Sequence, residues 1–357
     1  MIKPALFSNL SFLRIFLGIA IVFYHLPAWT QFQRDVYLEY FYLFNDVFFC
    51  LSGYLMFHNF FTRVQVSNWK RDVTRRLKTL YPLHFIMLCT WTIVSVSESQ
   101  LAGLFGLEHS GENNNSPLNF IKNLMFIQGW RLKTDFSFNH PAWVFSALLL
   151  CYICARLIFL TRSKLLVAAI SFMISGISFV YMISSHTEST QGFSVPRVFL
   201  GFFIGGLFGL ISRSFEPNLL QILFFSVFSM SSIWLMLQYL EERASFFIAL
   251  PFSSLIWLST RKRLSKSLKP NLELRLKYFD RLTFAILISH SLPIFLIEHL
   301  CIVMIDGPTE KLRGTKYIEL SNIQGTFFIS ASLLLAFLVA AFLHRLDQAL
   351  QRSKLMS

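Results

Sequence analysis

Long apolar segments follow one another along the whole chain, and shorter polar stretches separate them. A membrane-spanning helix needs about 20 mostly apolar residues, and each segment is compared with that length. The pattern predicts about ten spans, at residues 9–28, 38–58, 78–97, 141–160, 165–184, 196–213, 218–237, 244–260, 282–303 and 324–344. We therefore expect an all-α fold, a polytopic membrane helix bundle that forms one domain over residues 1–357 with no appended soluble domain.

The loops between these segments differ in their content of Lys and Arg. With the N-terminus placed in the cytoplasm, about 22 of these residues fall in inner segments and about 9 in outer ones, so the positive-inside rule predicts that both termini are cytoplasmic. The longest outer segment, near 98–140, contains the polar run EHSGENNNSP and then the more apolar run FIKNLMFIQGW. Because a loop of this length without its own structure is unusual, we expect a re-entrant or interfacial element there.

Composition agrees with the membrane prediction. The chain is 54% hydrophobic and 14% charged, whereas a soluble protein carries about 25% charged residues, and the mean hydropathy is +0.54. The net charge of +13 follows from the basic inner loops, so we expect membrane lipid rather than nucleic acid at this surface. The sequence contains no P-loop, nucleophile elbow or zinc-ligand spacing, so it predicts no metal site.

Two ionisable residues lie in the first apolar segment, LRIFLGIAIVFYHL. Such residues cost several kcal/mol to insert and are functional-site hypotheses by default. Arg14 and His25 are separated by a rotation of about 1100°, so they share one helix face, about 16 Å apart along the axis, with Gly18 on the same stripe. The predicted orientation puts Arg14 near the cytoplasmic end and His25 near the outer end. The structural alternatives are that Arg14 reaches lipid phosphates and that His25 hydrogen-bonds a neighbouring helix.

Two further ionisable residues occur inside predicted spans. Asp46, in the second segment, needs a partner because a charge that faces lipid is costly, and Arg14 and His25 are the candidates. His290 lies near the middle of segment 282–303 and needs a partner too. Both are therefore candidate site residues.

The remaining candidates lie in loops, at segment ends or at packing positions. Arg75 and Arg76 belong to the basic stretch WKRDVTRRLKTLYPLHF, which either anchors a span at anionic lipid head groups or binds the phosphates of a donor, since Arg matches phosphate oxygens. Ser52 is a small residue suited to close helix packing. Trp143 marks the outer start of a span, as Trp commonly does, and Arg197 precedes the glycine-rich run FLGFFIGGLFG.

Taken in order, these motifs resemble the acyltransferase-3 family of integral membrane acyltransferases, which typically have ten spans. The family's first span carries Arg or Lys, ten residues and then His, a spacing that Arg14 and His25 reproduce. Its second span, D-x-F-F-x-L-S-G-F, is similar to residues 46–54, and its basic stretch ending R-I-x-P is similar to residues 75–82. Weaker similarities follow as far as His290 and cover nearly the whole chain.

The chain departs from the family pattern at three places. Leu148 stands where the family's W-S-L-S-x-E has Glu, and Thr79 stands where R-I-x-P has Arg. The Ser-Tyr pair before the terminal His is Thr283–Phe284 here. No role can be carried over for that glutamate, and the departures raise two alternatives, a divergent acceptor and an inactive member.

The resemblance implies an enzyme of the bacterial inner membrane that moves an acyl group, usually acetyl, from cytoplasmic acyl-CoA to a hydroxyl of a cell-envelope or exported carbohydrate or glycolipid. Acyl-CoA is then a donor substrate, and no bound cofactor is implied. Imidazole suits the removal of a hydroxyl proton near neutral pH, so our hypothesis makes His25 the general base and Asp46 the residue that orients it. The substrate-binding candidates are Arg14, Arg75, Arg76, Ser52, Trp143, Arg197 and His290.

A rival hypothesis is a transporter or flippase that moves a solute or lipid-linked sugar along the same polar path, because intramembrane Arg, His and Asp suit transport equally well. The lack of a detectable repeat pair argues against it. A non-catalytic membrane scaffold is the third possibility, and it leaves Arg14 and His25 without a purpose.

Overall fold

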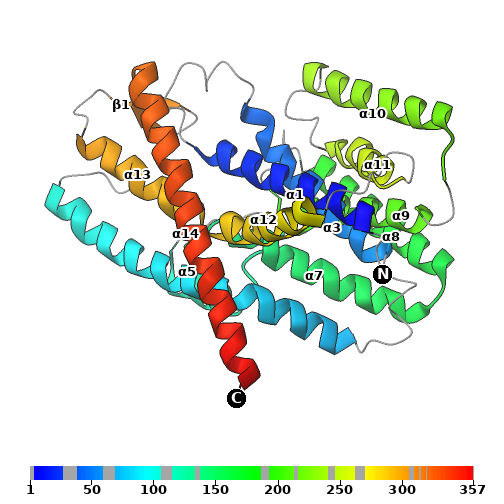
Figure 1. Cartoon of the computed structure of the whole chain (residues 1–357), viewed down its shortest axis with the longest axis horizontal. Coiled ribbons are helices and arrows are strands. Elements are labelled where there is room, and N and C mark those ends of the chain that lie inside the picture. The colour runs from blue at the N-terminus through cyan, green and yellow to red at the C-terminus, as the bar shows by residue number, and fades with distance from the viewer. Residues whose placement is uncertain are drawn as a thin grey trace.

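The computed structural model describes twelve stretches of the chain: residues 4–26, 38–58, 69–105, 115–132, 137–185, 193–212, 216–239, 246–261, 270–304, 309–312, 315–318 and 320–356. These stretches form a bundle of helices in which α14 crosses the others (Figure 1). A short antiparallel hairpin, β1 (Thr309–Leu312) with β2 (Thr315–Ile318), is the one sheet in the described part.

Every apolar segment predicted from the sequence contains a helix in the structure. The helices are α1 (Pro4–His25), η1 (Leu38–Leu43), α3 (Phe44–His58), α5 (Trp69–Phe105), α6 (Pro117–Leu124), α7 (Ala142–Ile158), η2 (Phe159–Thr161), α8 (Lys164–Ser184), α9 (Val195–Ile211), α10 (Leu219–Tyr239), α11 (Ala249–Ser259), α12 (Pro270–Ser289), α13 (Ser291–Met304) and α14 (Asn322–Met356). Among the described residues, five helices are long and apolar enough to cross a membrane, and α12 with α13 makes a sixth if the pair is one span. A helical membrane bundle is thus supported, while ten spans and cytoplasmic termini stay predictions.

The span predicted over residues 282–303 is interrupted in the structure. The chain is bent by 51° between α12 and α13, and His290 sits at the break. Pro293 explains the interruption, because proline has no N–H to donate and its ring clashes with the carbonyl four residues earlier, that of Ser289. The break matters for function because it places His290 outside regular helix.

Helices α3 and α9 form the closest seam in the bundle, and glycine makes it possible. A Cβ atom on Gly205 would collide with the backbone carbonyl of Cys50, and one on Gly53 would collide with the carbonyl of Phe202. Small residues let two helix backbones approach in this way, which is typical of membrane helix pairs. This seam holds the polar residues of α3 and α9 at a fixed distance.

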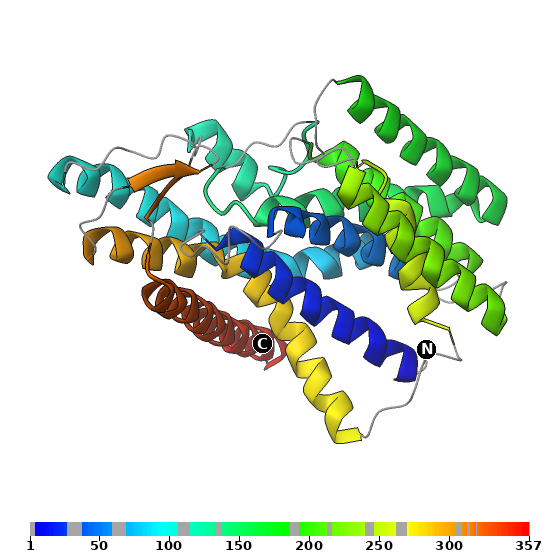
Figure 2. The same ribbon diagram turned by 90° about the horizontal axis from the view of Figure 1, so that it is seen from above.

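A second seam joins α1 to α12, and Figure 2 shows the two helices side by side. Here Gly18 faces the side chain of Thr283, so the close contact is with a methyl group and not with backbone. The stripe of α1 that carries Arg14, Gly18 and His25 therefore packs along α12, as far as the break at His290.

The described part of the outer segment 98–140 has structure of its own, as expected. Ser116 caps the N-terminus of α6, because its Oγ accepts a hydrogen bond from the N–H of Asn119. Two α5 side chains then contact the end of α6. The Tyr81 hydroxyl donates to the carbonyl of Leu124 at 2.7 Å, and Nε2 of His84 lies 2.8 Å from the carbonyl of Asn123. The segment is thus packed against the bundle.

Candidate functional site

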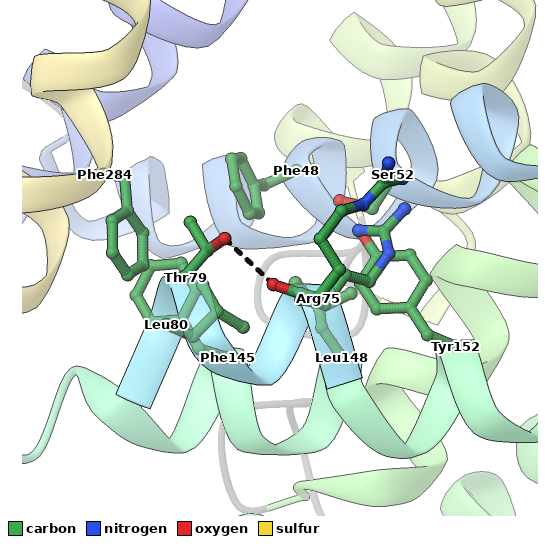
Figure 3. A pocket seen from close by; sticks show the side chains of 10 residues that line it. Phe48, Ser52, Arg75, Thr79, Leu80, Phe145, Leu148, Tyr152 and Phe284 are labelled. Carbon is green, nitrogen blue, oxygen red and sulfur yellow. Dashed lines mark hydrogen bonds between the residues drawn. The ribbon is translucent and has the colours of Figure 1, made fainter. Parts of the chain in front are cut away.

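A cavity of about 290 Å³ lies between α3, α5, α7 and α12 (Figure 3). This volume is at the lower end of the range for small-molecule sites, about 300–1,000 Å³. The four helices contribute the following lining residues: Phe48, Ser52, Arg75, Arg76, Thr79, Leu80, Phe145, Leu148, Tyr152 and Phe284. The sequence candidates Ser52, Arg75 and Arg76 are therefore brought together in one site.

The cavity is basic at one end and aromatic at the other. The guanidinium carbon of Arg76 lies 3.6 Å from the ring centroid of Tyr152, a cation–π contact that holds the charge at this end. Figure 3 shows Phe284 at the end opposite to Arg75 and Tyr152. A ligand with an anionic head and a thin, less polar arm matches this gradient.

The three departures from the family pattern meet in this cavity. Thr79, Leu148 and Phe284 come from three helices and all line it. The hydroxyl of Thr79 donates a hydrogen bond to the carbonyl of Arg75 in its own helix at 3.0 Å. The hydroxyl proton is therefore engaged by the backbone. At the positions where the family pattern has Arg and Glu, this chain thus has uncharged side chains that face the same space.

Three phenylalanine rings close the aromatic end. Phe145 lies edge-to-face against Phe284, with ring centroids 4.9 Å apart, and against Phe48 at 6.4 Å. Phe145 follows His140 by five residues, and Phe284 precedes His290 by six, which corresponds to about 7–9 Å of helix rise. The rings therefore separate the cavity from the histidines that lie beyond them.

Those histidines form a cluster of three, His25, His140 and His290. The ring centroid of His25 is 5.0 Å from that of His290 and 5.7 Å from that of His140. His25 ends α1 and is half-buried, as is His140, whereas His290 at the helix break is fully buried. Asn139 connects the segment that carries His140 to the segment that carries His290, because its side-chain amide donates a hydrogen bond to the carbonyl of Ile288 at 3.0 Å.

The cluster consists of ring contacts and not of metal ligands. Within the described stretches, no group of His, Cys, Asp or Glu has the arrangement of a metal site. Burial, together with the nearby His290, lowers the pKa of His140, which precedes the membrane helix, to about 3. His140 is therefore neutral at physiological pH.

The predicted partner of Asp46 is wrong. Arg197, and neither Arg14 nor His25, holds this carboxylate. Its Nε donates to Oδ1 at 2.9 Å and a terminal N–H group donates to Oδ2 at 2.7 Å, while the same nitrogen donates to the carbonyl of Tyr42 at 2.9 Å. This planar, two-bond arrangement is the strongest that Arg and carboxylate form.

The correction has a physical cause in the glycine seam. Because α3 and α9 approach closely, Asp46 near the N-terminal end of α3 lies opposite Arg197 near the N-terminal end of α9. Both side chains are almost fully buried, so each satisfies the other in a place where a lone charge would be costly. Nothing in the linear order of segments reveals which two helices are neighbours.

Arg14 also has a carboxylate partner that sequence reasoning missed. Its guanidinium lies 3.2 Å from Asp280 on α12, and the Ser11 hydroxyl donates to the same carboxylate at 3.2 Å. Asp280 lies two residues before the predicted span 282–303, and an acidic residue at that position was the available signal. Arg14 does not line the cavity.

Trp143 is likewise outside the cavity lining. Its ring is buried against Phe49 of α3, with centroids 6.1 Å apart, which is a packing contact. The ring of His290, by contrast, contacts the ring of His25 directly. The structure therefore divides the candidates between a cavity, a histidine cluster and two ion pairs, and it leaves Trp143 in a packing contact.

Comparison with known families supports the resemblance found in the motifs. A family model described as an acyltransferase domain matches residues 7–346, nearly the whole chain. Neither the curated proteins nor the solved structures include a significant match to the chain.

Proposed function

The chain belongs to the acyltransferase-3 family, and on that premise we propose that it moves an acyl group from cytoplasmic acyl-CoA to a hydroxyl of a cell-envelope carbohydrate or glycolipid. The observation that carries this proposal is the alignment of the cavity, basic at one end, with the histidine cluster beyond its other end. A donor made in the cytoplasm and an acceptor outside it require a multi-pass protein of the cytoplasmic membrane, which we propose to be the bacterial inner membrane.

The basic end suits the phosphates of the donor. Arg75 and Arg76 lie near the start of α5, where guanidinium groups can form charge-assisted hydrogen bonds with phosphate oxygens. The hydroxyl of Ser52, which also lines the cavity, can contact the polar amides of the pantetheine arm. The donor would thus be held by its head while its arm enters the protein.

The length of the path matches the length of that arm. Tyr152, beside Arg76, lies about 15 Å of rise along α7 from Ala142, the first residue of the helix, which follows His140 by two residues. A pantetheine arm has about thirteen bonds between its phosphate and its sulfur, and an extended chain of that kind spans roughly 15 Å. A thioester whose phosphates stay at the arginines would therefore reach the phenylalanine rings, at the end of the cavity that faces the histidine cluster.

The reaction then needs one base. The neutral imidazole of His25 takes the proton of the acceptor hydroxyl, and the hydroxyl oxygen forms a bond to the thioester carbonyl carbon. The carbon–sulfur bond breaks, and the leaving CoA thiolate takes up the proton from the His25 imidazolium. The half-buried position of His25 leaves it accessible to an acceptor.

We propose acetyl as the acyl group, following the family habit, and assign no bound cofactor because acyl-CoA is consumed as substrate. Arg197 and Asp46 hold each other in this proposal, so they position the outer end of the site and do not bind substrate. Trp143 and Arg14 likewise act through packing and the Asp280 ion pair.

The test is an acyl-transfer assay with the purified full-length protein in detergent. Radiolabelled acetyl-CoA and a panel of cell-envelope glycans are incubated with wild type and with the His25→Ala variant. We expect labelled glycan with wild type and none above background with the variant. Solute uptake into vesicles without any acyl transfer would instead support the transporter hypothesis and overturn ours.

A further inference from the structure

A general base in a catalytic site is normally held by a second group that fixes its tautomer. We expected Asp46 to do this for His25, but Arg197 engages both of its oxygens. The structure offers another candidate on the opposite side of the cluster, at the break between α12 and α13. The inference below rests on the proposed function and concerns how His25 is oriented.

The first observation is the tautomer of His290. Its Nδ1 lies 3.0 Å from the carbonyl of Leu287 and 3.2 Å from that of Ile286. A carbonyl oxygen can only accept, so Nδ1 carries the proton and donates it. The carbonyl of Ile286 still accepts the backbone N–H of His290 at 2.9 Å. Leu287 lies in the last turn of α12, where carbonyls lack intrahelical donors, so the His290 side chain supplies a donor there.

The second observation is the other nitrogen. With the proton on Nδ1, the neutral ring presents a lone pair at Nε2. In the described part of the chain, Nε2 of His290 is buried and has no hydrogen-bond partner. A buried acceptor left unpaired costs about 1–3 kcal/mol, so this lone pair favours any donor that can reach it.

The third observation is the neighbour. The ring of His25 lies 5.0 Å from that of His290, centroid to centroid, at an interplanar angle of 42°. The two rings are in contact without a hydrogen bond to Nε2 of His290. At this spacing, a turn of the His25 ring can bring one of its N–H groups to the distance of about 2.9 Å that an N–H···N hydrogen bond needs. The other groups around His25 are His140, farther away at 5.7 Å, and Tyr24, which touches it edge-on at 5.0 Å.

We propose that His290 is the residue that positions His25. When the His25 ring turns toward it, Nε2 of His290 accepts a hydrogen bond from one ring N–H of His25, so the other His25 nitrogen is left unprotonated and faces the acceptor hydroxyl. The Leu287 carbonyl, His290, His25 and the substrate hydroxyl then form one directed chain of hydrogen bonds. Backbone carbonyls serve here the orienting role that a carboxylate serves in a Ser-His-Asp triad.

The test compares variants that keep different parts of the imidazole. In His290→Gln the side-chain oxygen can stand where Nε2 stood, so an acceptor for His25 remains. In His290→Asn the amide can reach only the Nδ1 position, and in His290→Met no strong acceptor remains. We expect kcat within about 10-fold of wild type for Gln, and a loss of about 100-fold for Asn and Met, with KM for acyl-CoA unchanged.

The matched control is His84→Asn. His84 is also fully buried and also contacts a backbone carbonyl, that of Asn123, but it lies outside the cluster. It should lower thermal stability without lowering kcat per folded molecule. Size-exclusion profiles of every variant identify the folded fraction, and the Met variant supplies the answer if the Asn variant does not fold.

Equal activity of the Gln, Asn and Met variants would overturn the proposal, as would a loss that appears in KM alone. Its failure is distinguishable from failure of the proposed function. An inactive wild type would sink the acyl transfer itself, whereas an inactive His25→Ala beside an active His290→Asn would sink only the role of His290.

Discussion

Two polar groups lie side by side at the same end of the bundle, and they are built on opposite principles. In the Asp46–Arg197 ion pair, both carboxylate oxygens and both engaged guanidinium nitrogens have partners. In the histidine cluster, by contrast, a buried nitrogen of His290 has none among the described residues. The two are connected through ring contacts, since Tyr42 contacts Arg197 and also Tyr24, which contacts His25.

Ionisable residues inside a membrane protein can be divided into structural and functional ones by whether their hydrogen-bonding groups already have partners. Intramembrane polarity alone made all of these residues functional candidates. A fully satisfied, bidentate pair has no capacity left for a substrate and stabilises the helix arrangement. A buried acceptor without a partner retains that capacity, so the chemistry is expected at the histidines.

The largest effect should come from breaking the ion pair on one side. Arg197→Met leaves the Asp46 carboxylate buried without a partner, which costs about 3–5 kcal/mol of folding free energy. We expect little monodisperse protein after extraction and a much lower Tm. The double variant Asp46→Leu with Arg197→Met removes both charges and should recover most of the loss, as measured by thermal unfolding in detergent.

If both the single and the double variant matched wild type in Tm, the ion pair would not be a structural element and the comparison would break. A single variant that folds normally but loses activity would reassign Arg197 to substrate binding.

The two glycine seams sharpen the same contrast at a smaller scale. Gly205→Ala sets a methyl group against the backbone carbonyl of Cys50, which cannot move alone, so we expect a loss of about 1–3 kcal/mol. Gly18→Ala meets only the methyl group of Thr283, which can rotate away, so its cost should be below about 1 kcal/mol. Because α1 carries His25, Gly18→Ala should lower kcat measurably while it changes Tm little. The reverse order of Tm values would show that the α3–α9 seam is not the rigid one.

A change in KM alone separates donor binding from both polar groups. Arg75→Gln or Arg76→Gln removes one charge-assisted hydrogen bond to phosphate, so KM for acyl-CoA should rise about 10-fold while kcat is kept. Arg71→Gln is the matched control, because Arg71 is an exposed residue of the same helix that does not line the cavity. An equal rise in all three variants would indicate a general effect of surface charge and not a binding site.

The sequence predicts the helices well because about 20 apolar residues in a row have few other stable solutions. It also predicts that Arg14 and His25 share a face, since one helix sets that geometry. It does not predict the partner of Asp46, because the contact between α3 and α9 depends on how separate helices pack. The bend at His290 could have been read from Pro293, three residues later.

The cavity was partly predictable for a similar reason. Arg75, Arg76 and Ser52 have side chains whose chemistry draws notice. Phe48, Phe145 and Phe284 are three of 41 phenylalanines in the chain, and no local pattern distinguishes them. Only the packing of four helices reveals that Thr79, Leu148 and Phe284, three separate departures from the family pattern, face one space.

We propose that the histidine cluster performs the chemistry while the ion pair maintains the fold. The most direct test measures acyl transfer per folded molecule for His25→Ala and for the double variant Asp46→Leu with Arg197→Met, each against wild type. We predict that His25→Ala folds with a Tm near that of wild type and loses activity about 100- to 10,000-fold, while the double variant retains activity within about 10-fold. Full activity in folded His25→Ala would contradict this proposal. So would a result in which the folded double variant loses acyl transfer while His25→Ala keeps it.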